Sequence, residues 1–187
     1  MEDVLKEEKD LIGLSKLYER AKKIKLLMLD VDGVLTDGAI IYDNFGDELK
    51  NFSVYDGFGL ILLSRAGIPV VIVTAKASKI VKRRARDMRV TKIYQNANDK
   101  LKVYSKVLKK FKLTDEQVCF IADELIDLPV IKRAGLAVGV PNAVAEIRQY
   151  SHYITKAEGG KGAVREVIEL ILKSQDKWDE LTERYHK

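Results

Sequence analysis

Short apolar runs alternate with amphipathic stretches along most of the chain, and this alternation restricts the fold more than any other feature. Six runs have the composition of β-strands; they cover residues 24–29, 69–73, 92–94, 118–121, 136–140 and 152–154. Four stretches between them have helical periodicity, at 57–65, 78–88, 100–111 and 128–134. Strands that alternate with helices favour a parallel sheet covered on both faces. We therefore predict an α/β fold with a doubly wound parallel sheet, which binds its ligands at the carboxyl ends of the strands.

One segment interrupts the alternation after the first strand. The β-like runs 39–42 and 48–54 flank residues 43–47 (DNFGD), which have the composition of a turn. We expect a β-hairpin that protrudes from the sheet. Asp56, which follows the hairpin, fits the N-cap of the next helix as well as it fits a pocket.

The length of 187 residues is that of one domain, because single hydrophobic cores serve roughly 100 to 200 residues. We place the core at 24–172. Apolar residues at three-to-four spacing predict an N-terminal helix within 1–23 and a last helix after Gly162. The charged segment 173–187 forms a tail, either as a continuation of that helix or as a frayed end.

The composition excludes several classes of protein. A single cysteine, Cys119, rules out a disulfide framework within the chain and fits a reducing compartment. No apolar run approaches the ~20 residues that span a bilayer, and the charged first residues do not resemble a secretory signal. We expect a cytoplasmic protein with no membrane partner.

The net charge of +5 is concentrated in one part of the sequence. Eight basic residues and one acid lie between Lys76 and Lys92. Apolar residues recur at helical spacing in the same stretch, which favours the solvated face of a helix. Attraction of small anions is the second interpretation, and we expect no nucleic-acid partner.

Two carboxylates follow the first apolar strand directly. Asp30 and Asp32 come after Leu26-Leu27-Met28-Leu29, and Gly33 follows them. Burying unpaired carboxylates is costly, so these residues require a cation or a polar cleft. The end of a strand in a doubly wound sheet is where such a cleft opens. The alternative is a pair of acids that are solvated at the strand end.

Further polar residues follow the later strands. Thr74 follows the second strand, Lys100 opens the helix after the third, and Asp123 follows the fourth with Glu124 and Asp127 close behind. Each has an ordinary explanation on its own, such as a helix cap, a helix lysine or a turn residue. Parallel strands place all these ends at one edge of the sheet, so we expect the residues to lie together.

The order of these residues resembles the four-motif signature of the haloacid dehalogenase superfamily of aspartate-nucleophile phosphatases. The resemblance covers residues 24 to 172 and rests on Asp30-x-Asp32-Gly-Val-Leu-Thr, Thr74, Lys100 and Asp123-Glu124-x-x-Asp127. Within the superfamily, residues 30–38, 55–59 and 159–167 are similar to the group that hydrolyses 3-deoxy-D-manno-octulosonate 8-phosphate.

The resemblance implies a role for each motif residue. Asp30 would attack phosphorus and form an aspartyl phosphate, while Asp32 would protonate the leaving group and then activate water. Thr74 and Lys100 would hold the phosphoryl oxygens. Mg²⁺ would be bound by the carboxylates of Asp30 and Asp123 and by the backbone carbonyl of Asp32, since Mg²⁺ prefers oxygen ligands. These residue types suit the reaction, because attack on a phosphate dianion requires its charge to be neutralised.

The resemblance also implies substrate contacts from Gly33, Ala75, Lys76 and Lys161. The group usually has Gly-Arg after the motif threonine, whereas this chain has Ala75-Lys76. Lysine offers a point charge where arginine can grip a carboxylate with two hydrogen bonds. The substrate is therefore expected to be a phosphorylated 3-deoxy-2-keto sugar acid, with eight carbons or, alternatively, nine. Glu124 stands where a second aspartate is usual. We expect Glu124 or Asp127 to contact the metal ligands without binding the metal itself.

The spacing of the motifs leaves no room for a cap domain. Only 43 residues separate Asp30 from Thr74, and the hairpin and one helix occupy nearly all of them. A bare site needs cover from water, so a neighbouring subunit is expected to supply it through the hairpin or residues 158–162. The resemblance implies a homotetramer.

Two other classes of function remain as alternatives. Phosphoryl-accepting receiver domains also combine acids, Thr and Lys around Mg²⁺, but their acceptor aspartate lies on a later strand than the acid pair. A catalytically inactive oligomeric protein that binds anions or nucleic acid is the second alternative. Ala75 and Glu124 favour it, and the five intact motif residues oppose it.

Overall fold

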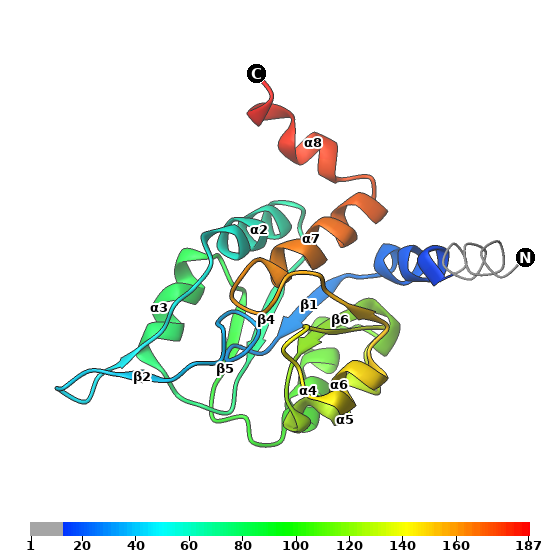
Figure 1. Cartoon of the computed structure of the whole chain (residues 1–187). Coiled ribbons are helices and arrows are strands. Elements are labelled where there is room, and N and C mark those ends of the chain that lie inside the picture. Colours follow the sequence, from blue (N-terminus) through cyan, green and yellow to red (C-terminus); the bar gives the residue numbers. More distant parts are fainter. Residues whose placement is uncertain (1–12) are drawn as a thin grey trace, which may run out of the picture.

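A six-stranded parallel sheet forms the centre of the protein in the computed structural model, which describes residues 13–187 (Figure 1). In spatial order the strands are β5 (Lys92–Tyr94), β4 (Val70–Val73), β1 (Leu26–Leu29), β6 (Val118–Ala122), β7 (Leu136–Gly139) and β8 (Tyr153–Ile154). Every neighbouring pair is parallel. The strand order reverses at β1 and β6, which confirms the predicted doubly wound sheet and opens a cleft at that point.

The four central strands are buried along their whole length. All residues of β1, β4, β6 and β7 are buried, because helices cover both faces of the sheet. The strands are therefore continuous apolar runs without alternation of polar residues. Polar side chains occur only where each strand ends, which concentrates them at one edge.

Helices cover the two faces of the sheet (Figure 1). Helix α2 (Val54–Arg65) packs against α7 (Ala163–Ser174) on one face, and α4 (Lys100–Phe111), α5 (Leu128–Ile131) and α6 (Ala145–Tyr150) form a continuous layer on the other. Helix α3 (Lys79–Asp87) links β4 to β5. Helix α6 escaped prediction because its six residues are too few to show periodicity and no side chain caps it.

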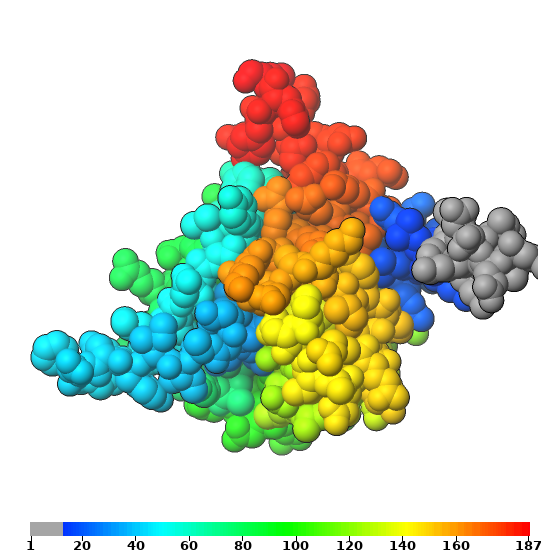
Figure 2. Space-filling model, in the orientation of Figure 1, coloured from blue at the N-terminus to red at the C-terminus, as the bar shows by residue number. Residues whose placement is uncertain are grey.

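The hairpin is present and protrudes from the body of the protein (Figure 2). Its strands, β2 (Ile41–Tyr42) and β3 (Glu48–Leu49), are shorter than predicted. The prediction that the second strand runs to residue 54 is wrong, because Ser53 accepts hydrogen bonds from two backbone N–H groups and begins α2 at Val54. Residues 31–73 otherwise contain only loops, α2 and β4, which confirms that no cap domain is inserted there.

Asp56 connects α2 to α7. It lies inside the first turn of α2, so the interpretation as an N-cap of that helix is wrong. The side chain is buried, and its Oδ1 accepts a hydrogen bond of 2.8 Å from the backbone N–H of Arg165. Burial raises the pKa of Asp56, and backbone N–H groups at the start of α7 oppose this rise. Gly162 precedes α7 and has no side chain to cap it, so Asp56 caps α7 from a distance.

The two ends of the described chain are helical. Residues 13–22 form a helix that buries Leu17 and Ala21, as the periodicity predicted; residues 1–12 of the expected N-terminal helix lie outside the described residues. The last segment is a separate helix, α8 (Trp178–Thr182), after a break at Asp176, so neither predicted form of the tail is right. Within residues 13–187, none of the helices is long and apolar enough to cross a membrane.

We expect Asp56→Ala to lower the free energy of unfolding by about 0.5–2 kcal/mol, the range for loss of a helix cap. Asp56→Asn keeps an acceptor oxygen and is expected to cost less. Urea denaturation followed by circular dichroism measures both variants, with Asp87→Ala on the exposed side of α3 as the matched control. Equal stability of Asp56→Ala and the parent would show that the contact between α2 and α7 carries no stability.

Candidate active site

A pocket of about 250 Å³ opens at the carboxyl ends of β1, β4 and β6. The structure brings most of the predicted site residues into its lining: Asp30, Asp32, Thr74, Ala75, Lys76, Lys100 and Asp123. Glu124 and Ile126 complete the wall on the β6 side. Residues separated by up to 96 positions in the sequence thus share one pocket, because parallel strands end at the same edge.

A buried ammonium group pairs with two of the acids beside β1. Lys100 begins α4, and its Nζ lies 2.8 Å from Asp30 Oδ2 and 2.6 Å from Asp127 Oδ1. The side chain of Lys100 is 1% exposed and that of Asp127 is fully buried. Burial by itself lowers the pKa of Lys100, but the charges of Asp30 and Asp127 outweigh it and raise the pKa. The lysine is therefore a fixed cation next to the predicted nucleophile.

Three carboxylates form a potential metal site. Ligand oxygens of Asp30, Asp123 and Asp127 all lie within 4.8 Å of one another. Asp123 Oδ1 is buried and accepts no hydrogen bond within the described part of the chain, so a cation would satisfy it. A set made only of oxygens suits Mg²⁺. The side chain of Asp32 is not in this group, and the contribution of its backbone carbonyl to a metal site stays a prediction.

Burial and mutual repulsion raise the pKa values of the acids in this cluster. Burial, followed by the charge of Asp30, raises the pKa of Asp123 to about 7 and the pKa of Asp127 to about 8. Burial also raises the pKa of Asp30, although Lys100 opposes the rise. One ammonium group is thus insufficient for three acids, and the cluster requires further positive charge at neutral pH.

Thr74 and Lys76 lie on the β4 side of the pocket. Thr74 is 3% exposed, and its Oγ1 accepts a hydrogen bond from the backbone N–H of Lys76. Ser78, not Thr74, caps α3, so the ordinary explanation of Thr74 as a helix cap is excluded. The Lys76 side chain is exposed at the pocket wall, where it can reach a negatively charged ligand.

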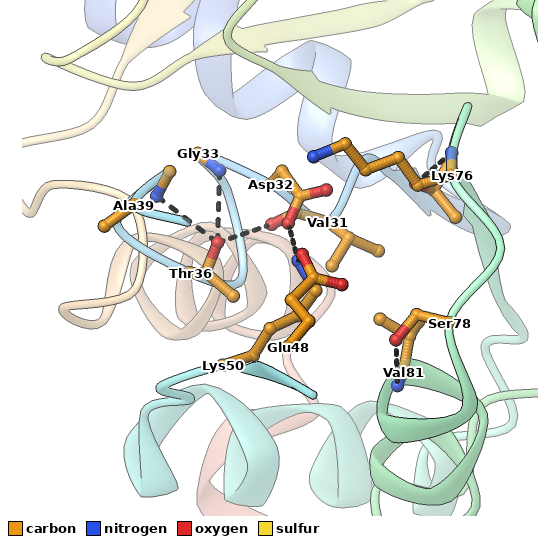
Figure 3. A network of polar contacts seen from close by, with 12 residues as sticks. Val31, Asp32, Gly33, Thr36, Ala39, Glu48, Lys50, Lys76, Ser78 and Val81 are labelled. Carbon is orange, nitrogen blue, oxygen red and sulfur yellow. Dashed lines mark hydrogen bonds and ion pairs between the residues drawn. The ribbon is translucent and has the colours of Figure 1, made fainter. Parts of the chain in front are cut away.

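Gly33 makes room for Asp123 and does not line the pocket itself. Its φ of +82° favours glycine, and a Cβ at this position would lie 2.0 Å from Asp123 Oδ2. Thr36 Oγ1 accepts a hydrogen bond from the backbone N–H of Gly33 and so holds the turn after β1 (Figure 3). The contact of Gly33 with substrate stays a prediction.

The glycine-rich segment packs behind the same turn. A Cβ on Gly159 would lie 1.8 Å from Gly33 O, and Gly160 donates its N–H to Val34 O at 2.9 Å. Asn142 joins the two loops, because its side chain donates to Gly33 O and accepts from the N–H of Gly159, both at 2.9 Å. The sequence contains no signal for Asn142, since both partners are brought to it by the fold.

Lys161 is not in the pocket of its own chain. Its side chain is 66% exposed and forms an ion pair of 2.7 Å with Glu158. Its predicted contact with substrate is therefore not made by the folded chain alone, and it stays a prediction.

Lys50 is a site residue that the sequence analysis missed. It lies at the base of the hairpin, and its ammonium group forms ion pairs with Asp32 and, at 2.9 Å, with Glu48 (Figure 3). Burial alone lowers the pKa of Lys50, but the two carboxylates raise it, so the group stays charged. The presence of Glu48 and Lys50 two residues apart on a strand was an available signal, because such residues point to the same side.

Comparisons with known proteins identify the family. The model of the haloacid dehalogenase-like hydrolase family matches residues 72–168. A curated relative from Yersinia pestis, 3-deoxy-D-manno-octulosonate 8-phosphate phosphatase, is 44% identical over 166 residues, which are 89% of each chain. This chain belongs to the haloacid dehalogenase-like hydrolases.

Solved structures agree with this membership. The 3-deoxy-D-manno-octulosonate 8-phosphate phosphatase from Moraxella catarrhalis, in complex with a magnesium ion, a phosphate ion and a KDO molecule, is 43% identical with a TM-score of 0.88. The match covers 90% of this chain and 97% of that one. The cobalt-bound enzyme from Haemophilus influenzae is 34% identical with a TM-score of 0.81, covering 84% of this chain and 92% of that one. The resemblance inferred from the motifs is thus confirmed.

The acid cluster predicts a pH-dependent stability for the metal-free protein. The pKa values of Asp123 and Asp127 rise from 3.8 to about 7 and 8, so the folded state binds more protons than the unfolded chain between about pH 4 and pH 8. The free energy of unfolding therefore falls as the pH rises through this window. Thermal melts in EDTA from pH 5 to pH 8 measure this slope, which we expect Asp123→Asn to reduce.

Added Mg²⁺ provides the matching test. At one hundred times its Kd, a bound ion raises Tm by about 5–10 °C at pH 8. The rise is expected to be smaller at pH 5.5, where protons compete for the same oxygens. Asp37→Asn, an exposed residue on the same loop, serves as the control. An equal effect of Mg²⁺ at both pH values would contradict metal binding by these acids.

Proposed function

We propose that this chain is a Mg²⁺-dependent phosphatase that hydrolyses 3-deoxy-D-manno-octulosonate 8-phosphate to 3-deoxy-D-manno-octulosonate and phosphate. One observation carries the proposal: Asp30 lines a pocket within ion-pairing distance of the buried Lys100 and beside the carboxylates of Asp123 and Asp127. The substrates named for relatives that share 44% and 43% identity support the choice of ester.

The reaction proceeds in two displacements. A carboxylate oxygen of Asp30 attacks phosphorus, a P–O bond to Asp30 forms, and the ester P–O bond breaks. Asp32 gives a proton to the departing sugar oxygen. Asp32 then removes a proton from water, which attacks phosphorus and releases phosphate and the free Asp30 carboxylate. Each step reuses the same two acids.

Positive charge makes the attack possible. Lys100 is held beside Asp30 by Asp127, and the Thr74 hydroxyl lies at the same wall to contact a phosphoryl oxygen. Bound Mg²⁺, held by Asp30, Asp123 and the backbone carbonyl of Asp32, neutralises further negative charge on the phosphoryl group. This donor set fits the ion, because Asp123 Oδ1 is buried without another partner within residues 13–187.

Lys76 is the side chain best placed to recognise the acid end of the substrate. It is exposed at the pocket wall, and it occupies the position at which the resembled group has an arginine. A point charge accepts several carboxylate positions, so a nine-carbon sugar acid phosphate is the second candidate substrate. An inactive anion-binding protein is less well supported, because all five motif residues line one pocket.

We expect Asp30→Asn to lower kcat by about 10⁴-fold or more, because the amide is not a nucleophile. Phosphate release is measured with the octulosonate ester, a nine-carbon analogue and glucose 6-phosphate, each with Mg²⁺ and with EDTA. The octulosonate ester should be the best substrate, and only with Mg²⁺. Asp37→Asn should keep full activity. A fully active Asp30→Asn would overturn the mechanism. Equal rates with glucose 6-phosphate and the octulosonate ester would overturn the choice of substrate.

We also infer that the chain assembles into a homotetramer through its hairpins. The hairpin exposes apolar side chains, of which Phe45 is 93%, Tyr42 69% and Ile41 48% exposed. The hairpin is a narrow arm that extends away from the body (Figure 2). Exposed apolar surface of this kind is typical of protein interfaces. A neighbouring subunit would also cover the open pocket, as a phosphoenzyme requires.

The double variant Tyr42→Glu, Phe45→Glu is expected to reduce the solution mass below that of a tetramer, because charges at both positions oppose burial. Analytical ultracentrifugation measures the mass, and phosphate release measures activity. Tyr150→Glu, an exposed aromatic residue on α6, is the control. A fully active monomer of the parent chain would contradict both the assembly and its role as a cover.

A further inference from the structure

Asp32 has to present one carboxylate oxygen to the leaving group, and a single side chain holds it in place. Asp32 lines the pocket and its side chain is 29% exposed. Its Oδ1 accepts a hydrogen bond from Lys50. Within residues 13–187, no other hydrogen bond or ion pair engages this carboxylate. Its orientation therefore depends on Lys50.

Lys50 is itself held by burial and by a second carboxylate. Its side chain is 1% exposed, although lysine is among the residues least often buried. Glu48 Oε1 lies 2.9 Å from the same ammonium group (Figure 3). Glu48 and Lys50 belong to one strand of the hairpin and its exit, so they project to the same side. Such a lysine is held at a defined position, unlike a flexible surface lysine.

We propose that Lys50 is the positioning residue of Asp32 in both halves of the reaction. Lys50 occupies Oδ1, which leaves Oδ2 free to face the ester oxygen. The proton passes from Oδ2 to the sugar oxygen as the P–O bond breaks, and in the second half Oδ2 takes a proton from the attacking water. Lys50 donates a hydrogen bond throughout and gives up no proton. This inference rests on the phosphatase function proposed above.

A purely structural role is the competing explanation. The pair of Lys50 and Glu48 could simply hold the base of the hairpin to the body of the protein. The two roles differ in their dependence on the leaving group. A sugar alkoxide requires protonation as it departs, whereas p-nitrophenolate is stable without it. Loss of a positioned acid therefore slows only the sugar ester, and general structural damage slows both esters.

The test compares Lys50→Met with the parent on the octulosonate ester and on p-nitrophenyl phosphate. We expect kcat/KM, which covers the steps up to the aspartyl phosphate, to fall by about 10–100-fold for the sugar ester, the usual effect of removing a partner of a site residue. For p-nitrophenyl phosphate we expect a change below about 3-fold. Lys102→Met, an exposed lysine on α4, is the matched control and should change neither value.

Two further variants guard against misfolding. The double variant Lys50→Met, Glu48→Gln also removes the charge of Glu48, which Lys50→Met alone would leave without its partner. This variant should show the same selective loss. Lys50→Arg keeps a cation that can donate a hydrogen bond to Asp32, so it should retain more of the rate on the sugar ester than Lys50→Met does.

The outcomes separate the two explanations. Equal losses on both esters in the single and double variants would overturn the proposal in favour of a structural role. Unchanged rates on the sugar ester would overturn it as well. Failure of the parent to hydrolyse the sugar ester would instead overturn the proposed function, so the two failures can be told apart.

Discussion

The ion pairs of Lys100 with Asp30 and Asp127 are the interaction on which the site depends. Acids at the end of a buried strand have lost most of their hydration, and two of them without a cation would repel each other strongly. Lys100, in the first turn of α4, supplies that cation. Its buried ammonium group lies 2.8 Å from Asp30 Oδ2 and 2.6 Å from Asp127 Oδ1. In the proposed reaction the same charge also holds the phosphoryl group, because Lys100 lines the pocket beside Asp30.

A second constraint is the close packing of backbones around the turn after β1. Gly33 is required because any side chain would collide with Asp123, and Gly159 is required because any side chain would collide with Gly33 O. Asn142 satisfies the polar groups left between these loops. The glycine-rich segment therefore acts as a support for the catalytic turn, and Asp56 in turn anchors the helix that follows it.

The hairpin combines two tasks in one element. Its tip exposes apolar side chains that we assign to subunit assembly, and its base carries the lysine that pairs with Asp32. The position of Asp32, the acid of the proposed reaction, thus depends on an arm that leaves the body of the protein. This arrangement gives assembly a direct physical route to the reacting atoms, without a cap domain in residues 31–73.

The sheet and most of the site were predictable from the chain alone. Continuous apolar runs marked the strands because those strands are covered on both faces, and the polar residues after them had to meet at one edge. By contrast, the tertiary structure alone decided the roles of Asn142 and Asp56. Asn142 reaches Gly33 and Asp56 reaches Arg165 across 109 positions each, so no local pattern describes these contacts. Periodicity reports which face of an element is buried, whereas a single hydrogen bond between distant loops depends on how all the elements pack together.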